Sequence, residues 1–489
     1  MKQILLILIL IPLGLYSQEC DCEATFNWTK KTFEENDAGY QYIIDTKGQR
    51  AYTLHNQSFI NKVKESKDTE ECGQLLNEWL RFFRSGHIGL EYIGLSANNL
   101  NNTASGEADD DLNAWETFSI DQNKFKEYLE QKSVHDYEGI WQFGGYKIGI
   151  KKEGATYIGF IIDAKTNLWK KEQVKLKIFE QDGKTSSIFY MLNRSEVTSD
   201  NVSLYGKNNL EIGDIRLSRI YPKLQDNSPY RLAFNALNTR LPFMEQINET
   251  TLYFRIPSFT GTPEKMAIDS VIEHNKEKIL STENLIIDIR NGTGGSDEGY
   301  YEILPLIYTN PIRTPSFHFY STPLNNKRWL DFIAYTGMAQ EFDMRFSQEE
   351  KVRLRKEYDT LSRHIGEFVS FDTTAVTVRT YDQVYPFPKQ VGIIHNHRNG
   401  STDEQFLLDA MQSKKVKLFG RTTMGALDFS NMNRVSSPCN NFRLWYTLSK
   451  SGRIPNMAID GIGIQPDYYI DEQVPEYEWI NFVTKILNQ

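Results

Sequence analysis

The spacing of apolar residues changes twice along the chain. In the first hundred residues apolar side chains recur every three to four positions, as at Phe59, Val63 and Trp79, which is typical of amphipathic helices. We therefore expect an N-terminal helical region over residues 18–97. It ends in the segment around His87, which has glycines close on both sides.

From residue 137 the apolar residues instead alternate with polar ones. Tyr146, Ile148 and Ile150 show the period of two that is typical of half-buried strands. Glycine-containing turns separate several such runs, which predicts a middle antiparallel β module over 137–231. A polar linker and a short helix are expected before it, over 98–136.

The remaining chain alternates strands and helices, which predicts an α/β core over 232–489. A charged helical insertion is expected within it, over 325–370. The expected strands are Thr251–Ile256, Asn284–Ile289, Val391–His395 and Val416–Phe419, and the expected helices are Pro263–Ile279, Gln348–Arg363 and one that begins after Ser401.

The first residues of the chain differ from the helical region that follows them. Lys2 precedes an apolar run from Ile4 to Leu15, which predicts a secretory signal peptide over 1–17, cleaved near Ser17. The protein would then be exported, either periplasmic or extracellular. A membrane anchor, or a lipid anchor at Cys20, is the alternative. No later stretch is apolar for long enough to predict a stable membrane span after signal removal.

Composition narrows the possible partners. The chain has 489 residues, a net charge of −9 and no basic stripe, so nucleic acid is not an expected partner. Four cysteines in an oxidising compartment allow bridges, and Cys72 is expected to pair with Cys20 or Cys22. No clustered ligand pattern such as HExxH occurs, so we expect no metal and no cofactor.

Two turns carry candidate chemistry. Ser401 follows a strand and a tight Asn399-Gly400 turn and opens a helix, where the helix N-terminus favours negative charge. A nucleophilic serine needs such a field, because an oxyanion forms beside it. Ser401 and Glu404 also match a capping box, so the simpler interpretation is a helix cap. We expect Glu404 to keep that capping role in either case.

The second turn is Arg290-Asn291-Gly292-Thr293-Gly294-Gly295-Ser296, a glycine-rich segment after a strand. Such turns present backbone N–H groups to an anion. The segment lacks the GK[ST] ending of a phosphate loop and the GxGxxG spacing of a dinucleotide fold. An oxyanion cradle therefore fits it better.

Four segments taken together resemble one family. NLIIDIRNGTGGS, VGIIHNHRNGSTDE, LFGRTTMG and AIDGIGIQPD occur in this order between Asn284 and Asp467. This set resembles the carboxyl-terminal processing serine peptidases, a superfamily that also includes the tricorn core and the retinoid-binding protein of the eye. The resemblance implies ClpP/crotonase-like βαβ units in the core, a peptide or protein substrate and a nucleophile at Ser401. It also leaves a second function open, namely a catalytically inactive protein of this fold that binds an apolar ligand or a peptide.

The resemblance also implies which residues would assist Ser401. The Ser–Lys branch of the family has its lysine 25 residues after the nucleophile, where this chain has Ala426, so a Ser–Lys dyad is not supported. The tricorn-like branch uses an upstream histidine and an acidic residue before a final G-x-G. The expected triad and oxyanion donors are therefore Ser401, His87 and Asp460, with the backbone N–H groups of Gly294 or Gly295 and of Thr402.

Other residues compete for these roles. His395 and His397 lie closer to Ser401 in sequence and are a rival base or half of a metal site. Asp428 and Asp467 are rivals of Asp460, whose simplest interpretation is a turn before Gly461.

Overall fold

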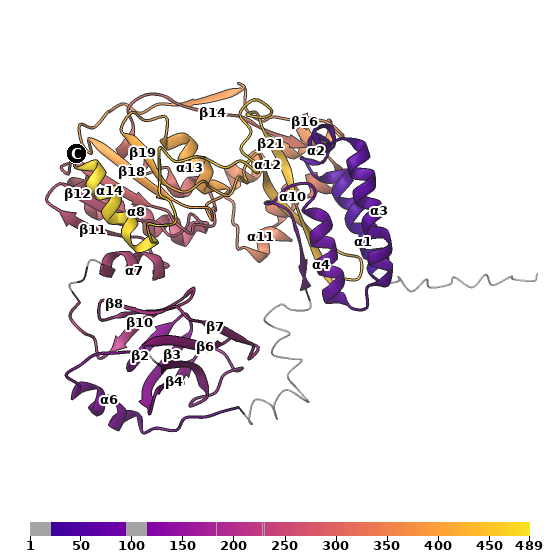
Figure 1. Ribbon diagram of the computed structural model, residues 1–489. Helices are drawn as coiled ribbons and strands as arrows, with labels where there is room; N and C mark the ends of the chain where they lie inside the picture. Colours follow the sequence, from indigo (N-terminus) through magenta and orange to yellow (C-terminus); the bar gives the residue numbers. More distant parts are fainter. Residues whose placement is uncertain (1–20, 94–114, 182, 227, 229) are drawn as a thin grey trace, which may run out of the picture. The chain divides into compact units, whose positions relative to one another are not determined.

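The structure is a computed structural model that describes residues 21–93, 115–181, 183–226, 228 and 230–489 (Figure 1). The chain forms two compact units. Unit 1 comprises Met1–Ser96, Arg313–Thr377 and Gly425–Ile462, and unit 2 comprises Ala97–Ile312, Val378–Met424 and Gly463–Gln489. The predicted signal peptide, Cys20 and most of the predicted linker lie outside the described residues.

Unit 1 packs helices from two distant parts of the chain around one sheet. Its helices are α1 (Cys22–Asn36), α2 (Tyr40–Lys47), α3 (Gln49–Glu65), α4 (Thr69–Leu80), α10 (Pro323–Ala334), α11 (Met338–Glu341) and α12 (Gln348–Ser362). Its five-stranded sheet contains β1 (Gly89–Tyr92), β15 (Phe317–Tyr320), β16 (Phe368–Val369), β20 (Phe429–Ser436) and β21 (Phe442–Ser451). Trp79, Trp329 and Leu444 share one buried core, so the N-terminal helices, the insertion and the C-terminal strands fold together.

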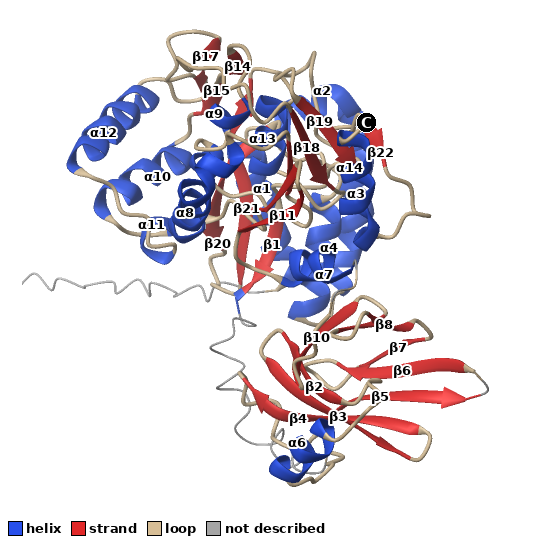
Figure 2. Cartoon of the chain, turned by 90° about the vertical axis from the view of Figure 1, so that its left-hand side faces the viewer, coloured by secondary structure: helices blue, strands red, loops and turns tan. Residues whose placement is uncertain are grey.

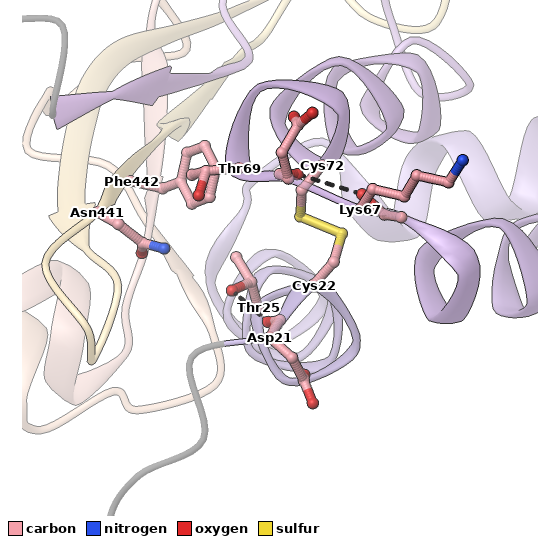
Figure 3. Close-up of a pocket in the computed structure, with 10 residues that line it drawn as sticks. Asp21, Cys22, Thr25, Lys67, Thr69, Cys72, Asn441 and Phe442 are labelled. Atoms are coloured by element: carbon pink, nitrogen blue, oxygen red, sulfur yellow. Dashed lines mark hydrogen bonds between the residues drawn. A yellow bond between two sulfur atoms is a disulfide. The ribbon is translucent and has the colours of Figure 1, made fainter.

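A disulfide fastens the N-terminal helices of unit 1. Cys22, the first residue of α1, is bonded to Cys72 in α4 (Figure 3). The bond links two residues that are 50 positions apart in the sequence. Of the two pairings left open by the sequence, the described residues therefore contain the one between Cys22 and Cys72.

A nine-stranded antiparallel sheet occupies the middle of the chain (Figure 2). Its order is β7-β6-β5-β4-β3-β2-β10-β9-β8. The strands are β2 (Gly139–Phe143), β3 (Tyr146–Glu153), β4 (Thr156–Ala164), β5 (Val174–Gln181), β6 (Lys184–Tyr190), β7 (Glu196–Ser199), β8 (Val202–Tyr205), β9 (Asn209–Ile212) and β10 (Ile215–Tyr221). Trp141, Ile148 and Leu176 are fully buried in its own core. Helix α6 (Gln122–Glu130) packs on the sheet through Phe125, which is buried with Ile140 of β2 and Phe160 of β4.

The last sheet, in unit 2, has the order β11-β12-β13-β18-β19-β22 and is parallel except for the edge strand β11. Its strands are β11 (Phe243–Asn248), β12 (Thr251–Arg255), β13 (Asn284–Asp288), β18 (Gln390–His395), β19 (Val416–Gly420) and β22 (Tyr468–Tyr469). The helices around it are α7 (Tyr230–Asn238), α8 (Gly261–Ile279), α9 (Leu304–Ile307), α13 (Thr402–Ala410) and α14 (Trp479–Leu487). α8 and α13 cover one face and α14 covers the other (Figure 2), because right-handed crossovers between successive parallel strands place their helices on one side.

The structure is therefore mixed α/β. The strands and helices predicted around Ser401 are present with ends within one or two residues of the expected positions. Outside these sheets, β14 (Ile312–Pro315) pairs with β17 (Val376–Arg379). Among the described helices, none is both long and apolar enough to cross a membrane.

Candidate functional site

The two turns singled out in the sequence are neighbours because their strands are neighbours. β13 and β18 run parallel, with Asp288 opposite Ile394. The chain segments that follow these strands therefore leave the sheet at the same edge. This brings the glycine-rich turn next to the turn that contains Ser401.

Ser401 has a strained backbone at the start of α13. Its φ is 59° and its ψ is −126°, a conformation that residues with a side chain rarely adopt. It makes no side-chain capping hydrogen bond, so the predicted capping box is wrong. The Glu404 carboxylate instead accepts a hydrogen bond from the hydroxyl of Thr423. Positive φ turns the Ser401 side chain away from the helix N–H groups that a cap would bind.

The Ser401 side chain lies against the glycine-rich turn. A Cβ atom added to Gly294 would be 2.7 Å from the Ser401 Cβ and 3.2 Å from its Oγ, so only glycine allows this approach. Among the described residues of unit 2, the Ser401 hydroxyl has no hydrogen-bond partner. A strained serine with an unoccupied hydroxyl between a strand and a helix is the geometry of a nucleophile elbow.

Two backbone N–H groups belong to neighbours of this site: Thr402 follows Ser401, and Gly295 follows the glycine that lies against its side chain. The Thr402 hydroxyl donates to the carbonyl of Gly295 at 2.9 Å and ties the start of α13 to the glycine-rich turn. Among the described residues of unit 2, the N–H groups of Gly295 and Thr402 have no hydrogen-bond partner. Two unpaired donors next to a hydroxyl are able to bind an oxyanion.

Three side chains that the sequence did not single out join the two turns. Asn396 donates to the side chain of Asn291 at 2.9 Å, and Asn399 donates to the carbonyl of Ile289 at 2.7 Å and to Asp403 at 2.9 Å. Burial raises the pKa of Asp403 to about 7, although hydrogen bonds from Asn399 and the Gly294 N–H lower it. The only available signal was that polar residues follow a buried strand, which does not say what they contact.

The strand before the glycine-rich turn ends in a buried ion pair. Arg290 and Asp288 are both fully buried and 2.7 Å apart, and Tyr253 donates to Asp288 at 2.7 Å. Burial opposes ionisation of Asp288, but Arg290 and Arg255 outweigh it and hold its pKa at about 2. The carboxylate therefore stays charged and fixes the start of the turn.

If the N–H of Gly295 binds the oxyanion of a hydrolysed peptide, as the sequence predicts, Gly295→Ala should lower kcat/KM by about 10²-fold, the usual loss when one oxyanion donor is removed. The added Cβ would lie 2.2 Å from the carbonyl oxygen of Phe259, and φ is +143°, so the turn must shift. Steady-state peptide hydrolysis measures the loss, and circular dichroism checks the fold. Gly366→Ala, also at positive φ but with open space around it, is the matched control. Unchanged activity of folded Gly295→Ala would argue against this donor.

His87 lies in unit 1, immediately before β1, with φ at +54°. Its Nδ1 is 2.6 Å from the carbonyl oxygen of Phe429. A carbonyl oxygen only accepts, so Nδ1 carries the proton and Nε2 keeps a free lone pair. Burial lowers the pKa of His87, and Arg84 lowers it further, so the ring is neutral at pH 7. His87 also lines a hollow of about 420 Å³ with Met432 and Trp445.

A buried ion pair supports the His87 backbone. Arg84 and Asp37 form two hydrogen bonds with each other, one of them 2.8 Å long, and both side chains are almost fully buried. The same Arg84 donates to the His87 carbonyl at 3.2 Å, and Asp37 accepts from the N–H and hydroxyl of Thr447 at 3.0 and 2.9 Å. This network holds the His87 backbone in its positive-φ conformation.

Asp460 also lies in unit 1, and backbone groups hold it. One carboxylate oxygen accepts from the N–H groups of Leu427 and Asp428, each at 2.7 Å. Burial, followed by the charge of Asp428, raises the pKa of Asp460 to about 6. The rival Asp428 is paired with Arg453 at 3.2 Å and accepts from the Ile459 and Asp460 N–H groups.

The remaining rivals have other environments. His395 is fully buried, and neither of its ring nitrogens has a hydrogen-bond partner among the residues that the structure describes. Burial lowers the pKa of His395 to about 4. His397 is exposed. Asp467 accepts from the N–H of Leu418, in the middle of β19, at 2.8 Å. Among the described residues, no group of three or more histidine, cysteine, aspartate or glutamate side chains could hold a metal ion.

Comparison with known proteins finds one matching family model. Residues 250–470 match the model of peptidase family S41. No curated protein matches the chain. Among solved structures, mature CPAF is similar over 96% of each chain at 12% identity with a TM-score of 0.50, which indicates a shared fold.

Two further similar structures are more distant. A putative peptidase from Parabacteroides merdae has 12% identity over 96% of this chain and 98% of its own, with a TM-score of 0.41. The photosystem II D1 C-terminal processing protease has 11% identity over 93% and 94%, with a TM-score of 0.36. The match to the model of peptidase family S41 spans both turns of the site and supports a serine peptidase.

Proposed function

We propose that Ser401 is the nucleophile of an exported peptidase, with His87 as general base and Asp460 as the acid of the triad. The observation that carries this proposal is the strained Ser401, whose hydroxyl is unpaired within unit 2 and lies against Gly294. Strain of this kind costs about 1–3 kcal/mol, and it persists at functional sites. We place the residues in ClpP/crotonase-like βαβ units, as the parallel sheet supports.

In the proposed reaction the Ser401 Oγ attacks the carbonyl carbon of the scissile peptide bond. His87 Nε2 takes the serine proton and returns it to the leaving amine, and water then hydrolyses the acyl-enzyme by the same route. The N–H groups of Gly295 and Thr402 bind the oxyanion. Gly295 is preferred to Gly294, because the N–H of Gly294 faces the Asp403 carboxylate.

The carbonyl of Phe429 and the carboxylate of Asp460 have separate tasks in this scheme. Phe429 holds the tautomer of His87 through Nδ1. Asp460, with a pKa of about 6, is ionised at neutral pH and favours the imidazolium that forms during the reaction.

A covalent serine probe tests the nucleophile. A fluorophosphonate should label the wild-type protein, and peptide mapping should place the label on Ser401. Equal labelling of wild type and Ser401→Ala would exclude this serine. A protein that takes no label but binds an apolar ligand or a peptide would instead fit the alternative function, an inactive member of the fold.

Export is the second part of the proposal. The apolar N-terminal run predicts a signal peptide, and the Cys22–Cys72 bridge is typical of proteins that fold in oxidising compartments. Intact mass of the mature protein should place its first residue near Gln18. A mature protein that retains Met1 would contradict cleavage.

A further inference from the structure

Two carbonyl groups of strand β20 accept hydrogen bonds from side chains of other elements. His87 Nδ1 donates to the carbonyl of Phe429, and Arg328 Nη1, from α10, donates to the carbonyl of Asn431 at 2.9 Å. Phe429 and Asn431 are two residues apart on β20, and the backbone of Asn431 is turned out of the extended conformation, with φ at +58°. A guanidinium group therefore lies within unit 1 a short distance from the histidine of the proposed triad.

Arg328 has no charged partner among the described residues. Its Nε is buried and has no hydrogen-bond partner. Burial also lowers the pKa of Arg328, to about 10, with only Tyr446 opposing this shift. Removing a charge from water without a counter-ion is unfavourable, so a carboxylate brought by a ligand would stabilise this half-buried guanidinium.

This guanidinium lines a cavity of about 410 Å³ with an excess of positive charge. The charged residues lining the cavity are Lys327, Arg328, Arg434, Arg443, Asp331 and Glu341. Both acids are already paired, Asp331 with Lys327 at 2.9 Å and Glu341 with Arg443 at 3.1 Å and with Arg434. Of the cations that line the cavity, Arg328 is the one that has no carboxylate partner among the described residues.

The cavity adjoins the hollow around His87. Arg434 lines the cavity and its guanidinium lies over the ring of Trp445 at 5.2 Å. Trp445 in turn lines the hollow that contains His87. Gly89 and Arg434 both stand opposite Trp445, from β1 and β20 respectively, so the two regions share one row of the sheet.

We propose that the cavity binds an acidic side chain of the peptide substrate, with Arg328 as its ion-pair partner. This proposal rests on the proposed function, because it places the cleaved bond near His87. An extended peptide advances about 3.3 Å per residue, so the acidic residue lies about two to four positions from the cleaved bond. Arginine suits this task because its planar group binds a carboxylate with two hydrogen bonds.

Paired peptides test the proposal. Each pair differs only by Glu or Gln at one position, scanned across both sides of the cleaved bond. On the unaltered enzyme we expect kcat/KM to be about tenfold higher for Glu at one position within that range, as for a partly buried charge pair. Arg328→Met should reduce the Glu/Gln ratio to near one. Arg353→Met, which removes a mostly exposed cation from α12, should keep the ratio.

Three results would overturn the proposal. One is a ratio near one at every position of the unaltered enzyme, a measurement that needs no variant to fold. Another is loss of cleavage on amidating the C-terminus with no Glu/Gln preference, because the recognised carboxylate would then be the terminal one. The third is an Arg328→Met enzyme that is folded and keeps the full ratio.

Binding separates this inference from the proposed catalysis. Fluorescence anisotropy with Ser401→Ala should show tighter binding of the Glu peptide than of its Gln partner, whether or not the wild type cleaves either. If no peptide is cleaved but this preference is present, the catalytic proposal fails and the cavity assignment stands. Equal binding of the two peptides overturns the cavity assignment.

Discussion

Ser401→Ala should lower kcat for peptide hydrolysis by about 10⁴-fold or more, the loss typical when the nucleophile of a serine peptidase is removed. The physical reason is that alanine has no oxygen with which to attack the peptide carbonyl. Initial-rate measurements with a fluorogenic peptide give the number. Ser296→Ala, at an exposed serine beside the same glycine-rich turn, is the matched control and should keep activity within about twofold.

The stability of Ser401 variants tests the strain independently of activity. Alanine at φ +59° has the same conformational cost as serine, so the melting temperature of Ser401→Ala should change little. Glycine adopts this backbone freely, so Ser401→Gly should be inactive and more stable by about 1 kcal/mol. Denaturant unfolding measures this difference. A Ser401→Gly protein that is less stable than wild type would mean that the serine backbone is not strained.

His87→Gln should lower kcat/KM by about 10³-fold or more, because the serine then has no base for its proton. Glutamine keeps a side-chain donor for the carbonyl of Phe429, so the loss reports the missing basic nitrogen rather than a missing contact. His274→Gln, at an exposed histidine on α8, is the control and should leave the rate unchanged. Full activity of His87→Gln would transfer the role of base to another residue.

The pH profile follows from the same histidine. Only neutral His87 accepts the serine proton, and burial lowers its pKa below the usual 6.5. Activity should therefore be constant around neutral pH and fall as the pH decreases through a value below 6.5. Protonation of Asp460, whose pKa is about 6, acts in the same direction. An activity that already falls between pH 8 and pH 7 would contradict a neutral, buried His87.

Local patterns were sufficient for the elements that carry the site. Short apolar runs bounded by turn residues predicted β12, β13, β18 and β19, because these strands are buried along almost their whole length. Helical spacing predicted α8 and α13. The turn residues after β13 and β18 were visible for the same reason. Polar residues and glycines stand out in the sequence where a buried parallel strand ends.

Contacts between distant segments were not predictable in this way. Ser401 and Glu404 match a capping box in sequence, but the box does not form in the structure. The Ser401 side chain lies against Gly294 instead, and the Thr402 hydroxyl donates to the carbonyl of Gly295. The partner of His87 Nδ1 is a main-chain carbonyl 342 residues away, and a carbonyl leaves no signature in the sequence.

The periodicity and the two turns are properties of neighbouring residues, so they could be read along the chain and led to Ser401. His87 and Asp460 became candidates only through the resemblance that the four short segments carry. The backbone strain at Ser401, the choice of Cys22 for Cys72 and the lone charge of Arg328 depend on which surfaces pack together. Packing is set by the free energy of the whole fold rather than by any one segment, which is why these features appeared only with the structure.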